Sequence, residues 1–380
     1  MENGTEETFK IGEGDFEMIK VCHLSSVHPA NDTRILLKEC SSLAKYYNVT
    51  LIACTDKEYC YSNVSIIPFK KINNRFIRMV FSPLKMFFEA LNHKAEIYHI
   101  HDPELLITLI LLKILTNAKL IYDIHEDVVS DLQSKTYLRG ITRRVITAIF
   151  GEFEKNVSKL TDYNITATPF IRKKFKKFNS KTIDINNYPI LNELAELHLP
   201  QKQKVCYIGN ITKVRGISSI IESLEYVDAE LLLAGNYNPP RYRDELITLK
   251  GWSKVTELGH INRIKMKEVL SLSNAGLVIF EPEPNHINAQ PNKLFEYMSA
   301  SVPIIGSRFP LWEVIVEGNN CGLLVDPQKP KELAKAIQYI FDYPEEAEIM
   351  GKNGREAVEK YYNWSNEENK LMKIYKDLCS

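Results

Sequence analysis

The segment Asn288–Glu296, with the sequence NAQPNKLFE, combines a helix start with groups that bind anions and hydroxyls. It follows an apolar run and a loop rich in proline and asparagine, and Pro291 suits the first turn of a helix. The free backbone N–H groups of Asn292 and Lys293 would point out of that helix start, where the dipole favours an anion. One turn further, the Glu296 carboxylate can accept two ribose hydroxyls. The alternative is an ordinary surface helix with a glutamate in its first turn.

A second turn, from Gly209 to Gly216, also follows an apolar run and precedes a helical pattern. Gly209 lets the backbone approach a ligand closely, and Asn210 comes directly after it. We expect Arg215 to be the main cation for a diphosphate, because its planar guanidinium matches phosphate oxygens. Lys213 is the supporting candidate. Solvated charges on a loop are the alternative.

Two histidines, His99 and His101, stand at the end of a predicted strand, directly before Asp102. Strand alternation sends both imidazoles to the same face. A histidine on a strand is usually a satisfied core residue, although a His-x-His-Asp run also has the ligand types of a metal site. The sequence leaves both interpretations open.

Polar residues follow two further predicted strands in the first half of the chain. Asp123, His125 and Glu126 come after one strand, and their types favour acceptor-side or catalytic roles. A solvated polar loop is the alternative. His28 and Arg34 follow the first strand and are weaker functional candidates.

The elements that must position these residues alternate between short β-branched runs and helical patterns. This alternation predicts parallel sheets covered by helices on both faces, with ligands at the carboxyl ends of the strands. Asparagine and proline at 186–189 interrupt the pattern, which then restarts. We therefore expect an α/β protein with two doubly wound, Rossmann-like domains facing each other across a cleft, at residues 18–187 and 188–361.

The composition is ordinary for a globular protein, with 44% hydrophobic and 25% charged residues. Seven scattered cysteines form no CxxC pair, which suits a reducing compartment. The acidic, polar first 17 residues have no signal-peptide pattern, and we expect a frayed leader there. The apolar run at 105–112 is too short to span a bilayer. Residues 18–187 carry an excess of Lys and Arg, so only this part is expected to meet an anionic surface.

The continuation KLFEYMSASVPIIGSRFPLWEVI resembles the E-x7-E region of family 4 retaining glycosyltransferases, which have the GT-B fold, in the version of bacterial polysaccharide enzymes. The similarity extends from about Ile19 to the C-terminus. One position departs from the family pattern, because Asn288 replaces the first glutamate, which lies near the donor sugar. Asn210 and Arg215 stand where the family has an arginine and a lysine on the diphosphate.

The resemblance implies a retaining hexosyltransferase that moves a sugar from a nucleoside-diphosphate sugar to a glycan or lipid-linked acceptor in surface polysaccharide synthesis. It also implies that His101 faces the donor sugar and that the helix at 362–380 packs back onto the first domain. No essential metal or other cofactor is expected. The predicted roles are catalytic for His101, Arg215 and Glu296, donor-binding for Gly209, Asn210, Lys213, Asn288, Asn292 and Lys293, and acceptor-side for His28, Asp123, His125 and Glu126.

Two basic-aromatic stretches, 69–94 and 170–181, suit an anionic membrane surface, and solvated helix faces are the alternative. We expect a cytoplasmic protein, peripheral on the inner face of a membrane, that binds no nucleic acid. The alternative functions are a sugar-nucleotide epimerase of the same fold, a non-catalytic sugar- or lipid-binding protein, and a metal-dependent hydrolase. The hydrolase would use His99, His101, Asp123 and His125.

Overall fold

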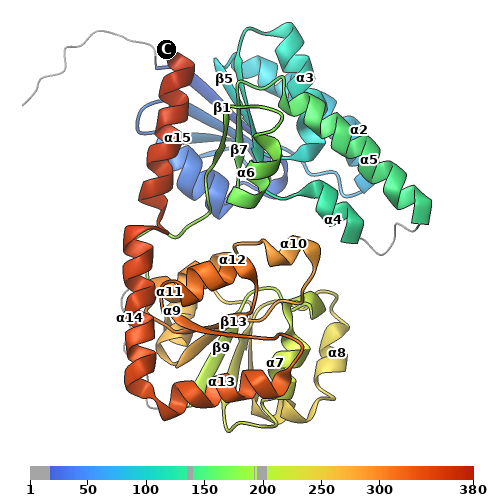
Figure 1. Cartoon of the computed structure of the whole chain (residues 1–380). Coiled ribbons are helices and arrows are strands. Elements are labelled where there is room, and N and C mark those ends of the chain that lie inside the picture. Colours follow the sequence, from blue (N-terminus) through green and yellow to red (C-terminus); the bar gives the residue numbers. More distant parts are fainter. Residues whose placement is uncertain (1–17, 135–139, 192, 195–202) are drawn as a thin grey trace, which may run out of the picture. The chain divides into compact units, whose positions relative to one another are not determined.

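The structure, a computed structural model, describes residues 18–134, 140–191, 193–194 and 203–380 (Figure 1). The predicted acidic leader lies outside these residues. By its contacts the chain separates into two compact units, Met1–Ile121 and Tyr122–Ser380. This division falls inside a strand, whereas the domains expected from the sequence meet at 187/188. The expected boundaries stay predictions.

The first sheet has the strand order β3-β4-β2-β1-β5-β6-β7-β8. Among the pairs resolved in register, β1–β2, β1–β5, β2–β4 and β7–β8 are parallel and β3–β4 is antiparallel. Most residues of β1 and all residues of β5 are buried, as in parallel strands covered on both faces, although buried histidines and serines interrupt their apolar residues. The bounds are β1 Lys20–Pro29, β2 Asn48–Cys54, β3 Tyr59–Tyr61, β4 Val64–Pro68, β5 Ile97–Ile100, β6 Lys119–Ile124, β7 Tyr163–Thr166 and β8 Thr182–Asp184.

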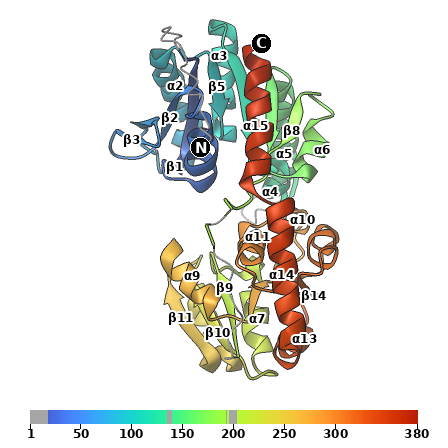
Figure 2. The ribbon, with the colours of Figure 1, turned by 90° about the vertical axis from the view of Figure 1, so that its left-hand side faces the viewer.

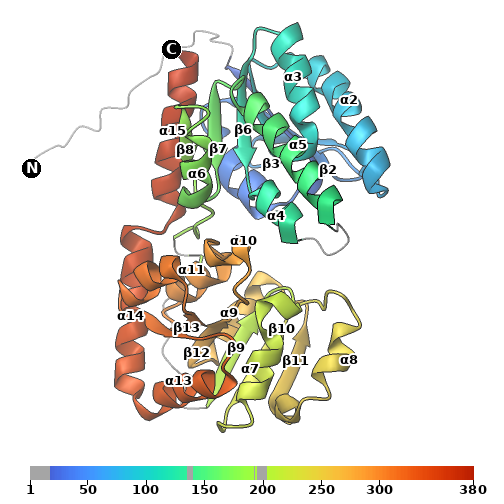
Figure 3. The same ribbon diagram turned by 45° about the vertical axis from the view of Figure 1, so that its right-hand side comes forward.

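Three of the helices between these strands, η1, η2 and α6, begin at a capping side chain or a proline. Asp32 accepts hydrogen bonds from the backbone N–H groups of Arg34 and Ile35 at the start of η1. Helices α2 and α3 lie side by side (Figure 3). The bounds are η1 Thr33–Cys40, α1 Ser41–Leu43, α2 Arg75–His93, η2 Pro103–Leu105, α3 Leu106–Leu115, α4 Val128–Ser134, α5 Gly140–Ser158 and α6 Pro169–Phe175.

The second sheet, in the order β11-β10-β9-β12-β13-β14, is parallel throughout. Side chains alternate between two apolar clusters: Leu277 lies in one and Val278 in the other. This is the doubly wound arrangement, and it confirms the predicted α/β fold class. The bounds are β9 Lys204–Ile208, β10 Glu230–Ala234, β11 Val255–Gly259, β12 Ala275–Val278, β13 Ile304–Ser307 and β14 Gly322–Val325.

One face of the second sheet is covered by helices that include α7 and α13, which lie side by side (Figure 1). The other face is covered by helices that include α9, α11 and α14. The bounds are η3 Lys213–Arg215, α7 Ile217–Ser223, α8 Tyr242–Leu246, η4 Lys250–Lys254, α9 Arg263–Ser271, α10 Pro284–Ile287, α11 Asn292–Ser299, α12 Pro310–Trp312, η5 Glu313–Glu317, α13 Pro330–Asp342, α14 Pro344–Lys360 and α15 Trp364–Cys379.

Helix α11 is fixed against the sheet by Tyr297. The backbone N–H of Ile208 donates to the Tyr297 hydroxyl at 3.0 Å. The ring lies so close to Gly276 that a Cβ there would be 2.2 Å from it. A side chain at Gly276 would therefore displace the helix that carries Lys293 and Glu296.

The last helix, α15, runs beside β8 (Figure 2). The Tyr163 hydroxyl of β7 donates to Asp377 at 2.7 Å, and the Asn186 N–H donates to Glu367 at 2.9 Å. The chain end is thus bonded to the last strands of the first sheet. Among the described residues, no helix is long and apolar enough to span a lipid bilayer.

Candidate functional site

Gly209 follows β9 and adopts a backbone conformation that side chains disfavour, with φ at +144°. Its N–H donates to the carbonyl of Ala234 at 2.9 Å, which holds the turn beside β10. A Cβ on Gly209 would lie only 2.7 Å from Nζ of Lys293. The positive φ favours glycine here, and the Lys293 amine lies directly beside its backbone.

Lys293 lies on α11 with only 7% of its surface exposed. Its Nζ lies 4.8 Å from the centroid of the Tyr207 ring, 5.6 Å from that of Phe280, and 3.4 Å from the Tyr207 hydroxyl. No carboxylate among the described residues forms an ion pair with it. Burial lowers the pKa of Lys293 well below its usual value, and nearby Arg215 lowers it further, while Glu296 opposes the shift.

Arg215 ends the short helix η3 and places the centre of its guanidinium 4.8 Å from the Phe280 ring centroid. Arg215 and Lys293 therefore lie against the same aromatic ring, close enough for Arg215 to disfavour the charge on Lys293. Lys213 and Asn210 are exposed on the same turn. Of the residues predicted for the diphosphate, the structure brings Arg215, Lys293 and Gly209 together.

Helix α11 begins at Asn292, as the sequence predicts, with Pro291 as its cap residue. No side chain caps this helix start, and Asn292 is exposed. Glu296 is half-buried one turn further, and its Oε1 accepts a hydrogen bond from Nη1 of Arg263 at 2.5 Å. Asn288, the C-cap residue of α10, is also half-buried.

In the first unit, His101 is buried in a stack of three imidazoles with His23 and His99. The ring centroids of His99 and His101 are 4.5 Å apart, so the predicted common face is confirmed. Nδ1 of His23 lies 2.9 Å from Nε2 of His101. One Glu39 oxygen lies 3.9 Å from Nε2 of His99, and the other lies 3.1 Å from Nε of Arg34. Arg34 and His101 thus belong to a buried polar network.

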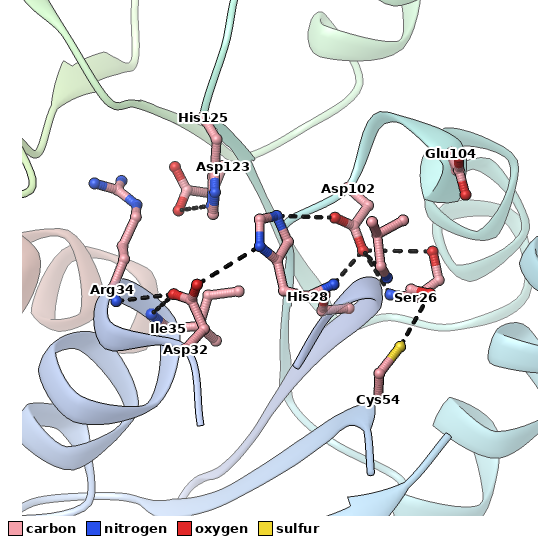
Figure 4. Close-up of polar contacts among 12 residues, drawn as sticks. Ser26, His28, Asp32, Arg34, Ile35, Cys54, Asp102, Glu104, Asp123 and His125 are labelled. Atoms are coloured by element: carbon pink, nitrogen blue, oxygen red, sulfur yellow. Dashed lines mark hydrogen bonds and ion pairs between the residues drawn. The ribbon is translucent and has the colours of Figure 1, made fainter. Parts of the chain in front are cut away.

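His28 lies near the end of β1, between two carboxylates (Figure 4). Its Nδ1 is 3.7 Å from Asp32 and its Nε2 is 3.4 Å from Asp102. Asp102 also accepts hydrogen bonds from the backbone N–H of Ser26 at 2.5 Å and from Val27 at 3.1 Å. Asp102 therefore holds the end of β1, which carries the half-exposed His28.

Asp123 lies near the end of β6 and His125 directly follows the strand. Nε2 of His125 lies 3.0 Å from Oδ2 of Asp123 (Figure 4). Asp123 is buried and His125 is half-buried, whereas Glu126 is exposed. The histidine and the aspartate form a bonded pair, and Glu126 points to solvent. The acceptor-side roles of all three stay predictions.

Two features of this region are not predicted from the sequence, namely the buried side chain of Lys293 and the contact of Arg263 with Glu296. The sequence assigns Lys293 only a backbone N–H at the helix start. One signal was available: Lys293 directly precedes Leu294 and Phe295 in the apolar part of a helix that must pack on a sheet. Arg263 lies 33 positions before Glu296, and nothing in its local sequence connects the two.

Residues 192–357 match the family model described as "Glycosyl transferases group 1". The chain is 27% identical to spore coat protein SA of Bacillus subtilis (strain 168) over 192 residues, 48% of this chain and 50% of that protein. It is 24% identical to alpha-D-kanosaminyltransferase of Streptomyces kanamyceticus over 193 residues, 49% of each protein. The chain thus spans about half the length of these curated relatives.

Among solved structures, sucrose-phosphate synthase from Thermosynechococcus elongatus superposes with a TM-score of 0.79 at 20% identity, over 95% of this chain and 99% of that one. Anabaena Alr3699/HepE, solved with UDP and glucose, gives 0.74 at 14% identity, over 94% and 100%. WaaG, a glycosyltransferase involved in lipopolysaccharide biosynthesis, gives 0.71 at 14% identity, over 94% and 99%. The fold is GT-B. Together with the family match, it supports a glycosyltransferase.

Proposed function

We propose that the chain is a retaining, family 4-type hexosyltransferase that uses a nucleoside-diphosphate sugar. The observation that carries the proposal is the pair of cations, Arg215 and Lys293, gathered beside the bare backbone of Gly209. Burying an ammonium against aromatic rings beside a guanidinium is costly unless an anion completes the site. The diphosphate of the donor is such an anion.

Most of the catalysis would be electrostatic. As the bond from sugar to phosphate breaks, negative charge develops on the leaving diphosphate. Arg215 and Lys293 stabilise that charge, and the buried position of Lys293 excludes water from one side, which strengthens its effect. Bound diphosphate also favours the protonated form of Lys293, because a neighbouring anion opposes the effect of burial on its pKa.

Glu296 is the proposed ligand of the nucleotide ribose. Its Oε1 is held by Arg263, which leaves the second carboxylate oxygen to accept a ribose hydroxyl.

Asn288 would contact the donor sugar as a neutral amide. His101 is proposed to act near the donor sugar, with His28, Asp123, His125 and Glu126 on the acceptor side. The proposed acceptor is a glycan or lipid-linked sugar of surface polysaccharide synthesis.

The donor proposal is tested by thermal unfolding with UDP-, GDP- and ADP-sugars. A ligand at about 100 times its dissociation constant stabilises a protein by about 2.7 kcal/mol. We expect one base to stabilise the wild type and Arg215→Ala to abolish the effect. Lys267→Ala, which removes an exposed cation on α9, is the matched control. No stabilisation of the wild type by any of the three would reject the donor class.

Retention of the anomeric configuration is read by NMR of the transferred sugar. The same spectra of a donor incubated without acceptor distinguish an epimerase, which would convert the donor to a new epimer.

No essential metal is proposed, because Arg215 and Lys293 supply positive charge to the diphosphate. Loss of transfer in the presence of a chelator, with recovery on adding a divalent ion, would contradict this.

Peripheral membrane association, on the cytoplasmic face, is proposed for α2 in the stretch 69–94. One side of this helix packs inward through residues such as Met86 and Phe87. The opposite side exposes an apolar stripe at helical spacing, made of Ile77, Val80, Phe81, Leu84 and Phe88. Aromatic and aliphatic side chains on a basic helix suit the interface of an anionic bilayer.

The second basic stretch, 170–181, supports this proposal less. Three of its cations form ion pairs, Arg172 with Asp184, Lys174 with Asp127 and Lys181 with Asp377. Phe175 is buried. These contacts are those of a helix packed on its own protein, so the membrane proposal rests on α2.

A further inference from the structure

A third basic side chain lies on the aromatic ring that carries Arg215 and Lys293. His286, in the short helix α10, contacts Phe280 edge-on, with ring centroids 5.1 Å apart and an interplanar angle of 61°. Trp312 packs on Phe280 as well, with centroids 5.4 Å apart. Phe280 is therefore a buried aromatic platform that is contacted by three basic side chains, those of Arg215, Lys293 and His286.

The backbone holds His286 in place. Its N–H donates to the carbonyl of Glu283 at 2.8 Å, and its carbonyl accepts from the N–H of Ala289 at 3.0 Å. Nδ1 of the imidazole is buried and has no hydrogen-bond partner among the described residues. A buried polar atom without a partner costs about 1–3 kcal/mol, which a ligand atom would offset.

Charged groups from three segments act on the imidazole. Burial lowers the pKa of His286, the backbone carbonyl of Glu281 opposes this, Arg215 on η3 lowers the pKa further, and Glu283 raises it. Lys293 on α11 shares the Phe280 platform. Without an anion, the surroundings therefore favour a neutral imidazole.

We propose that His286 is a third ligand of the anion bound by Arg215 and Lys293, and that it takes up a proton when a diphosphate binds. The inference rests on the proposed function, because it assigns a residue to the same donor site. A diphosphate beside Arg215 adds negative charge near the imidazole and offsets the effect of Arg215, so the imidazolium becomes the favoured form. The protonated ring then donates a charge-assisted hydrogen bond to a phosphate oxygen.

The proton uptake has a definite sign. Because the bound state holds more protons on His286 than the free state, affinity for the diphosphate rises as the pH falls through the pKa of the bound form. The ordinary value for histidine is 6.5, and it is lowered in the free protein. The dependence is thus expected between about pH 6 and 8, where histidines near anions titrate.

The test is calorimetric titration of the wild type with UDP-, GDP- and ADP-glucose, whose diphosphates do not titrate in this range. The sugar nucleotide that binds most tightly is then titrated at pH 6 and pH 8 in buffers of different ionisation enthalpy. The dependence of the binding enthalpy on the buffer gives the number of protons taken up on binding. Three variants are compared: His286→Gln, which cannot take the charge, His286→Phe, which keeps the packing on Phe280, and His260→Gln, an exposed histidine, as the control.

We expect His286→Gln and His286→Phe to bind about tenfold more weakly at pH 6, the loss of one charge-assisted hydrogen bond. At pH 8 they should approach the wild type. The number of protons taken up on binding should fall by the share of His286, leaving only any uptake by Lys293, while the melting temperature is kept. If a donor binds the wild type and the variants with equal affinity and proton count, His286 only packs on Phe280 and the inference is wrong. If no donor binds the wild type, the proposed function fails, and the inference falls with it.

Discussion

Nη1 of Arg263 lies 2.5 Å from Oε1 of Glu296, and the same guanidinium donates through Nε to Glu193 at 2.7 Å. Arg263 is the first residue of α9, whereas Glu193 belongs to the connection before the second sheet. The two acceptors hold the planar guanidinium from two sides, and it in turn fixes one oxygen of Glu296. Arg263 is thus a positioning residue for the proposed ribose ligand.

Replacing Arg263 is expected to weaken nucleotide binding without removing a phosphate contact. Arg263→Met should lower affinity for the nucleoside diphosphate about tenfold, because Glu296 loses the charge-assisted bond that orients it. Glu296→Gln should lower it by a similar factor. The double variant should be no weaker than either single one, since both act on the same contact. Calorimetric titration of the wild type, the two single variants and the double variant with the nucleoside diphosphate completes this double-mutant cycle.

The comparison needs a variant that removes a similar surface ion pair far from the nucleotide. Arg243→Met serves, because Arg243 pairs with Glu257 at the outer strand β11. Additive losses for Arg263→Met and Glu296→Gln would show that the two residues act independently, against a positioning role.

Lys293 is expected to stabilise the ligand complex at the expense of the ligand-free fold. Lys293→Met keeps the volume and removes a buried cation beside Arg215. It should raise the free energy of unfolding of the ligand-free protein by about 1–2 kcal/mol. Affinity for the nucleoside diphosphate should fall by at least about tenfold. A variant that lost both stability and affinity would show that Lys293 is part of the structural core.

The pH dependence of this stability has a definite sign. The folded protein lowers the pKa of Lys293 well below 10.5, so the unfolded chain binds more protons over the interval between the two values. The free energy of unfolding of the wild type therefore rises with pH through that interval, and Lys293→Met should lack this rise. Lys267→Met, at an exposed position on α9, is the control.

Much of the fold could be predicted because buried parallel strands appear as short, continuous apolar runs. Both parallel sheets are present, as the alternation of apolar runs and helical patterns predicts, and α11 begins at Asn292, next to the predicted Pro291. The exposed edge strand β3 and the short β8 have no such signal, since three residues are too few to show a period. The contacts of Lys293 could not be predicted, because they join α11 to Tyr207 of β9 and Phe280 after β12.

Glu154 on α5 is expected to make stability depend on pH near neutrality. It is buried, and it accepts a hydrogen bond from the Tyr122 hydroxyl at 2.9 Å. Burial raises the pKa of Glu154 from 4.5 to about 7, although Lys174 and Tyr122 oppose the shift. Because the folded state binds this proton more tightly, stability falls as the pH rises from 4.5 to about 7.

Glu154→Gln cannot ionise and still accepts from Tyr122. Relative to the wild type, its free energy of unfolding should increase by up to about 3 kcal/mol between pH 5 and pH 8. Denaturant titrations at the two pH values measure this difference. Glu152→Gln, an exposed position on the same helix, should change the difference by no more than about 0.5 kcal/mol. Equal pH profiles for wild type and Glu154→Gln would mean that Glu154 ionises freely in the folded protein.

The exposed stripe of α2 is expected to carry membrane binding. Phe81 and Phe88 are 58% and 64% exposed, so replacing both by serine should leave the fold intact. Each ring that inserts into the interface contributes on the order of 1.5–3 kcal/mol. The double variant should therefore lose at least about tenfold in partitioning onto phosphatidylglycerol vesicles, measured by sedimentation. Ile264→Ser, at a 72% exposed position on α9, should sediment like the wild type. Equal sedimentation of the double variant and the wild type would exclude α2 as the docking element, and equal binding to neutral vesicles would exclude a role for anionic lipid.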